Sequence, residues 1–152
     1  MAVSTAKAVA DAFLHISTEN RSGITNLKLQ KLIYYAQAWF LALHDEALFD
    51  DPIEAWVHGP VVPEVFRMYK HLKWSQIPGS GTPIEPQYVA DHLQEVWNKY
   101  GILDATKLEM LTHSEEPWKS ARGTLAPDIP SRSVITQESM KEYYSSLIED
   151  GK

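Results

Sequence analysis

The chain has 152 residues, enough for one domain with one hydrophobic core, and its 44% hydrophobic and 22% charged residues are ordinary for a globular protein. The absence of cysteine excludes disulfide bonds, thiolate metal ligands and cysteine nucleophiles. A net charge of −6 disfavours nucleic acid and favours a basic or neutral protein partner. No signal-peptide pattern opens the sequence and no apolar run approaches the roughly 18 residues of a membrane span, so we expect a cytoplasmic protein without membrane contact.

The first part of the chain predicts two helices, the second of them buried. Apolar residues at helical spacing predict a helix over 3–17, and Thr25 is placed to cap a second helix that runs to about His44. This second helix is apolar nearly all round, apart from a seam of Gln30, Gln37 and His44, so we expect it at the centre of the core. The seam is either a hydrogen-bonded strip against a loop or the floor of a groove open to a partner, and we favour the strip.

The stretch EAWVHGPVVPEVF predicts a strand, a rigid break and a new helix. Residues 53–57 are rich in β-branched and aromatic types, and the Gly59-Pro60 pair is a strong turn signal at their end. Pro63 suits the first turn of a helix ending near Lys73, because its missing N–H would have no partner there in any case. We therefore assign Gly59, Pro60 and Pro63 to the structure of the turn.

The rest of the chain predicts a long loop followed by further helices. Glycine and proline are frequent between 74 and 86, which is typical of a mobile surface loop. A helix follows over 87–100, with Gly101 as its C′ residue. Asp104 is placed to cap a fifth helix and Thr136 to cap the last one, and 114–122 predicts a short helical turn between them.

Only a small sheet is expected. The strand at 53–57 would pair with Val134-Ile135 or with Pro83-Ile84. The fold class that follows is α-rich α+β, a single compact domain over 1–152 with about six helices around a central buried helix (25–44) and a small β-sheet.

Signatures of enzymes are weak in this sequence. It contains no phosphate-binding glycine loop, no nucleophile elbow and no His-Glu-x-x-His pattern, and no two histidines are spaced to share a metal on one helix face. One group could converge as general acid and base: His58, Glu64, His113, Glu115 and Glu116. Nothing in their spacing requires it, and a glutamate just inside a helix start is favoured by the helix dipole alone. We predict no catalytic residue, no metal and no cofactor.

Several long strings of the sequence resemble the Panacea antitoxin domain family, also called the SocA-like or phage-associated protein family. They are ITNLKLQKLIYYAQAWFLAL from Ile24, LFDDPIEAW from Leu48 and VHGPVVPEVF from Val57, with HSEEPWKSAR from His113 and VITQESMKEYY from Val134 similar to the C-terminal half. The resemblance covers nearly the whole chain. It implies a bacterial or phage-borne antitoxin, with a part in phage defence, that neutralises a co-encoded toxin by direct protein contact.

The resemblance also implies an alternative mechanism, because one family member is an adaptor that hands its toxin to a protease. This chain would then deliver a toxin to a cytoplasmic AAA+ protease. A further alternative is an enzyme that reverses the toxin's chemical modification. DNA-binding autorepression is disfavoured by charge and by the lack of a convincing recognition helix. We also expect Lys28 and Lys31 to form a solvated edge rather than a nucleic-acid patch. No oligomeric state is predicted.

Residues for the toxin contact are chosen from positions that match the family pattern and from exposed-type residues near them. Tryptophan, tyrosine and arginine dominate many binding hot spots, although matched positions also build the fold. The toxin-binding candidates are Tyr34, Tyr35, Trp39, Trp56, His58, Val61, Arg67, Trp74 and Trp118. We expect the choice of toxin to be encoded by variable surface on the 74–86 loop, the 87–100 helix and the last helix.

Overall fold

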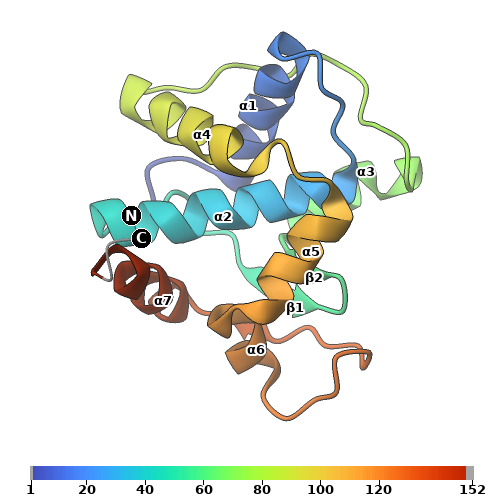
Figure 1. Ribbon diagram of the computed structural model, residues 1–152. Coiled ribbons are helices and arrows are strands. Elements are labelled where there is room, and N and C mark those ends of the chain that lie inside the picture. The colour runs from blue at the N-terminus through green and yellow to red at the C-terminus, as the bar shows by residue number, and fades with distance from the viewer. Residues whose placement is uncertain (1, 150–152) are drawn as a thin grey trace.

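One helix runs through the middle of the molecule and the other elements pack around it (Figure 1). The computed structural model describes residues 2–149. Its helices are α1 (Ala6–Glu19), α2 (Asn26–His44), α3 (Pro63–Tyr69), α4 (Gln87–Tyr100), α5 (Ala105–Ser114), α6 (Glu116–Arg122) and α7 (Gln137–Glu149), with a 3₁₀ turn at Lys70–Leu72 after α3. Its strands are β1 (Ile53–Trp56), β2 (Gly59–Val61) and β3 (Val134–Ile135). The predicted α-rich α+β class is confirmed, and α6 adds a seventh α-helix over the described range.

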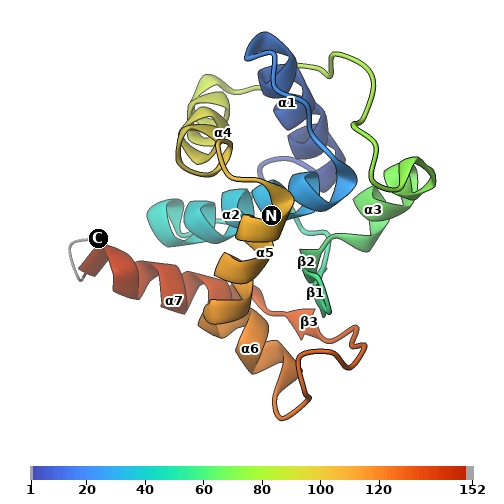
Figure 2. The same cartoon turned by 45° about the vertical axis from the view of Figure 1, so that its right-hand side comes forward.

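The central position predicted for α2 is confirmed. The Thr25 side chain caps the helix by accepting a hydrogen bond from the backbone N–H of Lys28. Figures 1 and 2 show α1 and α4 on one side of α2 and α7 on the other. Side chains on nearly every side of α2 are buried, which is expected because apolar residues occur on nearly every side of the helix. Leu43 is an exception to this burial, because it lies in the last turn of α2 and is 56% exposed.

Two glutamines of the predicted polar seam are buried and hydrogen-bonded to backbone groups of the flanking loops. Gln30 accepts from the N–H of Val62 at 2.9 Å, and Gln37 accepts from the N–H of Leu48 at 2.8 Å while donating to the carbonyl of Phe49 at 2.7 Å. The seam is therefore a hydrogen-bonded strip that holds two flanking loops against α2, and the third member, His44, is exposed at the helix end. It is not the floor of an open groove.

The sheet has the order β2-β1-β3, with both pairings antiparallel. Ile53 pairs with Ile135, so of the two expected partners the C-terminal one is used and Pro83-Ile84 lies outside the sheet. The assignment of Gly59 and Pro60 to a turn is wrong in detail. They form strand β2, and the hairpin turns through Val57 and His58.

Two local features explain how Gly59 and Pro60 fit a strand. Proline is tolerated in β2 because this strand lies at the edge of the sheet, where one side needs no ladder hydrogen bond. Gly59 has a φ of +113° and a Cβ there would lie 2.8 Å from Cε of Lys31. Pro63 begins α3 at its first turn, as predicted.

The 74–86 segment is a loop, as predicted, but it is fastened to its neighbours. The N–H of Ile77 donates to the carbonyl of Ile24 at 2.8 Å, and the N–H of Thr82 donates to the carbonyl of Asp11 at 3.1 Å. Gly81 passes so close to α1 that a Cβ would lie 2.2 Å from the Asp11 oxygen. The loop is thus a strap across α1.

The caps predicted for the later helices are present, with one correction. The Asp104 side chain accepts from the N–H of Lys107, and Thr136 accepts from the N–H of Ser139. Gly101 follows α4, but its φ of −63° is right-handed rather than the left-handed value of a C′ glycine. Glycine is required there by space, because a Cβ would meet the Trp97 ring at 2.6 Å. Within residues 2–149, no helix combines the length and the apolar character that crossing a membrane requires.

Candidate functional site

A groove of about 700 Å³ lies between the β1–β2 hairpin, α3 and the loop that precedes β3. We call it the hairpin groove. The hairpin and α3 are adjacent in sequence, and the third wall comes from a segment more than sixty positions later. Its lining residues are Leu27, Trp56, Val57, His58, Val61, Phe66, Arg67, Lys70, Pro130, Ser131 and Arg132.

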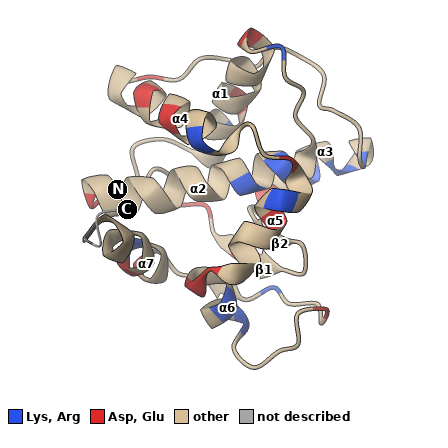
Figure 3. Ribbon diagram, viewed as in Figure 1, with Lys and Arg blue, Asp and Glu red and all other residues tan. Residues whose placement is uncertain are grey.

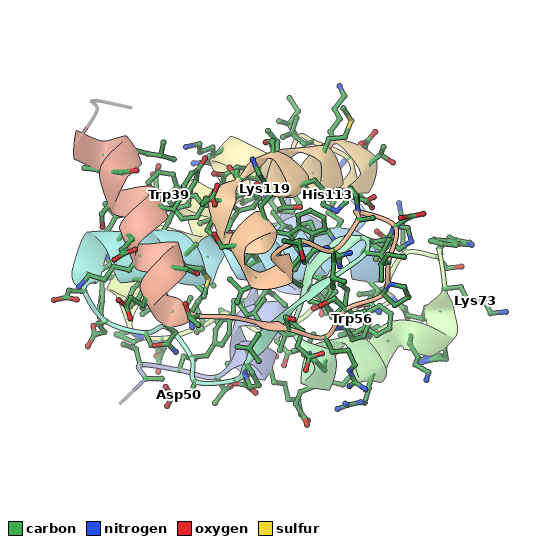
Figure 4. All side chains as sticks on the ribbon, turned by 90° about the horizontal axis from the view of Figure 1, so that it is seen from below. Trp39, Asp50, Trp56, Lys73, His113 and Lys119 are labelled. Carbon is green, nitrogen blue, oxygen red and sulfur yellow. The ribbon has the colours of Figure 1, made fainter. Side chains whose placement is uncertain are left out.

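The floor of the hairpin groove is built on Trp56. Its ring meets the ring of Phe66 edge to face, with centroids 5.1 Å apart, and its indole N–H donates to the Glu54 carboxylate at 2.8 Å. The carbonyl of Trp56 accepts from the indole N–H of Trp118, also at 2.8 Å. Figure 4 shows Trp56 close to the loop before β3 and to α3. The side chain is held on several sides while part of its surface stays open.

The rim of the hairpin groove is basic, although the protein is acidic overall. Three cations, Arg67, Lys70 and Arg132, line it, and no aspartate or glutamate does. Figure 3 shows the basic positions on α3 and around α6 and the loop beyond it. Arg67 forms an ion pair with Glu64 at 3.5 Å, and Arg132 forms one with Glu54 at 3.4 Å. Both arginine side chains are more than half exposed, so these pairs contribute little to stability.

Arg122 secures the outer wall of the groove. Its buried guanidinium donates to the carbonyl of Ala55 in β1 at 3.1 Å. The same group donates to the carbonyls of Ala126, Pro127 and Ile129 in the loop before β3. It also lies over the ring of Trp118, with Cζ 4.8 Å from the centroid. One side chain therefore ties the loop to the strand that carries the floor.

A second groove, of about 550 Å³, lies where the end of α2 meets α4 and α7. Trp39, Leu43 and Ile148 supply apolar surface, and its charged lining is mixed, with Glu95 beside Lys99. The indole N–H of Trp39 donates to the Tyr100 hydroxyl at 2.8 Å, and the Lys99 ammonium lies 4.5 Å from the Trp39 ring centroid. The two grooves differ in electrostatic character more than in size.

A tyrosine and glutamate network lies inward of the second groove. The Glu115 carboxylate accepts from the hydroxyls of Tyr35 at 2.8 Å and Tyr144 at 2.9 Å. Tyr35 stacks on Tyr100, with centroids 3.9 Å apart. Burial raises the pKa of Glu115, and the two phenol hydrogen bonds oppose this change. The network connects α2, α4, α7 and the α5–α6 junction, and no local sequence signal identified it.

Residues 29–119 match the model of the antitoxin SocA-like, Panacea domain family, which is more than half of the chain. The chain belongs to this family. A curated relative, "Antitoxin SocA" of Caulobacter vibrioides (strain NA1000 / CB15N), is 30% identical over 127 residues, which cover 74% of this chain and 68% of that protein. No solved structure matches the chain. The family resemblance predicted from the sequence is confirmed.

The family segment from α2 to α6 contains the hairpin and α3, and thus the floor of the hairpin groove. Four of the nine toxin-binding candidates line this groove: Trp56, His58, Val61 and Arg67. Trp39 lines the second groove. Trp74 lines neither of the two and is 78% exposed at the start of the strap.

Four candidates have almost no surface to offer a partner. Tyr34, Tyr35, Val61 and Trp118 are each at least 95% buried, so we correct their assignment to the core, with Val61 beneath the groove. Tyrosine and tryptophan occur in cores and at interfaces alike, and the sequence alone did not distinguish the two. The surface-accessible candidates are Trp39, Trp56, His58, Arg67 and Trp74.

The residues considered for general acid and base chemistry do not converge. His58 lies 3.2 Å from Glu109, whereas Glu64 pairs with Arg67 on α3. The ring of His113 is stacked on Trp118, and burial lowers its pKa. Among residues 2–149, no group of three or more histidine, aspartate or glutamate side chains is placed to hold a metal ion.

The lysines expected on a solvated edge are buried instead. Lys28 donates from Nζ to the carbonyl of Gly101 at 2.6 Å. Lys31 is fully buried beneath Gly59, and its Nζ has no hydrogen-bond partner among the described residues. Burial lowers the pKa of Lys31 to about 8, and the nearby Glu109 carboxylate opposes this change.

Proposed function

We propose that this chain acts as the antitoxin of a bacterial or phage-borne toxin–antitoxin system and neutralises its cognate toxin by direct, non-enzymatic binding. The observation that carries the proposal is membership of the antitoxin SocA-like family over residues 29–119. The curated relative is itself named an antitoxin. The partner that this implies is a toxin protein encoded next to the chain, and the mechanism is sequestration of the toxin's active surface.

The arrangement of the surface supports binding rather than chemistry. Two grooves of the size used for peptide or ligand contacts have partly exposed aromatic side chains, Trp56 and Trp39, held in place by hydrogen bonds. Aromatic residues of this kind supply large contact area at low cost in conformational entropy. Trp74 adds an exposed aromatic on the strap, where we propose that part of the choice of toxin is encoded.

The experiment is co-expression of the chain with the product of the neighbouring reading frame at graded ratios. Growth and co-purification are scored together, in hosts with and without their cytoplasmic AAA+ proteases. Growth rescue with a complex of fixed stoichiometry in both hosts is the expected result. The same ratios with the toxin alone and the chain alone are the controls.

Other outcomes would point to other mechanisms. Toxin levels that fall only when both the chain and a protease are present would identify an adaptor and contradict sequestration. Rescue by much less antitoxin than toxin, without a complex, would identify an enzyme that reverses the toxin's modification. Replacing residues 74–86 with a relative's loop should alter which toxin is neutralised, and an unchanged choice would remove the loop from the proposal.

A further inference from the structure

We propose that the hairpin groove binds a segment of the toxin in which a bulky apolar side chain is flanked by aspartate or glutamate. This inference rests on the proposed function, since it names the surface and the chemistry of that same contact. It places the apolar side chain against Trp56 and Phe66 and the carboxylates against Arg67, Lys70 and Arg132.

The charge of the groove argues for an acidic partner segment. The protein carries a net charge of −6, and yet every formally charged residue that lines this groove is a cation. Lys70 takes part in none of the ion pairs formed among residues 2–149. A cluster of cations on an acidic molecule favours the approach of an acidic segment at this place over the rest of the surface.

The two arginines can exchange their present partners for those of a bound segment. The Arg67–Glu64 pair is exposed on both sides, at 58% and 74%, and solvent weakens such pairs. Arg132 approaches Glu54 through Nε at 3.4 Å. A guanidinium has five donors, so its terminal nitrogens can donate to both oxygens of a carboxylate in the bidentate geometry that arginine favours.

The floor argues for an apolar anchor between those carboxylates. The indole N–H of Trp56 is already used by Glu54, so what remains for a ligand is the ring surface. That ring and Phe66 meet edge to face and form a corner rather than a flat plate. A pocket of this kind at the centre of a polar rim is the usual form of a binding hot spot.

Two comparisons support the proposal, one of the two grooves and one of the two kinds of partner. The second groove has Glu95 beside Lys99 and therefore lacks a single-sign rim. Nucleic acid would also be drawn to aromatic and basic side chains, but its affinity comes from many phosphate contacts. Three cations on a molecule of net charge −6 offer few such contacts.

The test measures the dissociation constant of the purified full chain for its toxin. It compares the wild type with a variant in which the charges of the two exposed arginines are reversed. Arg67→Glu with Arg132→Glu should weaken binding about 100-fold or more, because like charges then face each other across the contact. Trp56→Ala should weaken it by at least about 30-fold, as loss of a hot-spot aromatic does. The matched control, Lys7→Glu with Lys107→Glu, makes the same change in net charge at exposed positions outside the groove and should leave binding within about threefold.

A charge exchange separates direct contact from an indirect effect. Replacing the contacting carboxylates of the toxin with lysine should restore at least about tenfold of the affinity lost in the arginine variant. Circular dichroism and urea unfolding of each variant check that the fold is retained.

Three results would overturn the inference. The first is unchanged affinity of the arginine variant for a toxin that the wild type neutralises, which would leave the proposed function standing. The second is displacement of the toxin by a short single-stranded oligonucleotide, and the third is a toxin-free dimer abolished by the same substitutions. A wild type that neither binds nor rescues would contradict the proposed function itself.

Discussion

The indole N–H of Trp118 in α6 donates to the backbone carbonyl of Trp56 at 2.8 Å, across 62 positions of the chain. This bond joins α6 to the end of β1, beneath the floor of the hairpin groove. The Trp118 ring is at the same time stacked on His113 and lies under Arg122. Trp118 was expected at the toxin interface, and its place in the core makes it a support of the hairpin groove instead.

Replacing Trp118 with phenylalanine should destabilise the protein by about 1–3 kcal/mol, because the partly buried carbonyl of Trp56 loses its donor and the smaller ring leaves a gap. Urea unfolding measures the change. Trp74→Phe is the matched control, because Trp74 is 78% exposed, and it should remain within about 0.5 kcal/mol of wild type. Equal effects of the two substitutions would show that the Trp118 contact does not hold the hairpin.

Replacing Gln37 with leucine should cost about 2–4 kcal/mol in the free energy of unfolding, since the N–H of Leu48 and the carbonyl of Phe49 would be buried without partners. The comparison is Gln94→Leu on α4, an exposed glutamine whose side chain donates to Asn98, with an expected change within about 0.5 kcal/mol. Thermal and urea unfolding of both variants decide the matter. A Gln37 variant as stable as the control would contradict the role of the strip.

Replacing Lys31 with methionine should stabilise the protein most near neutral pH. The pKa of Lys31 in the folded chain is lowered to about 8 from 10.5, so the unfolded chain binds more protons between these values and wild-type stability rises with pH across that window. Below about pH 8 the wild type bears the whole free-energy cost of burying a charged lysine. Lys31→Met avoids this cost, so its free energy of unfolding should be higher by about 3 kcal/mol.

The check on Lys31 is urea unfolding near neutral pH and at about pH 10. The advantage of Lys31→Met over wild type should shrink at the higher pH, as the wild-type ammonium loses its proton. Lys107→Met, at an exposed position, should show no such dependence. An advantage that is constant with pH would mean that Lys31 is not the group responsible.

Replacing Gly81 with alanine should destabilise the protein more than Gly79→Ala in the same loop. Both glycines have positive φ, +68° and +101°, so each substitution strains the backbone. Only at Gly81 does the new Cβ meet α1, 2.2 Å from the Asp11 oxygen, whereas at Gly79 nothing lies within 4 Å. We expect a difference of about 1–3 kcal/mol in unfolding free energy. No difference would mean that the strap does not hold to α1 in solution.

The central helix and the helix caps could be predicted because their signals are local. Apolar residues all around α2, together with Thr25 before it, required a buried helix. Strand β2 was missed because Gly59 and Pro60 break most strands, and only the edge position of β2 and the close approach of Lys31 explain them. Burial of Lys31 likewise depends on tertiary neighbours that no helical periodicity describes.

The candidate site could be predicted only in part for the same reason. The residues of the hairpin and α3 lie in one motif, so Trp56, His58 and Arg67 were found together. The wall at Pro130 to Arg132 is distant in sequence, and its cation went unnoticed. Tyr34 and Tyr35 were misassigned because residue type does not tell a packed ring from an accessible one.

The hydrogen bonds of Arg122 affect the conformational entropy of binding at the hairpin groove. Its hydrogen bonds fix the loop before β3 on β1, so the groove has its shape before any toxin arrives. The loop therefore loses its conformational entropy when the chain folds. Toxin binding at that wall then costs little further conformational entropy. Antitoxin and toxin would meet close to rigidly at this surface, and the backbone of the loop would already be well ordered in the free protein.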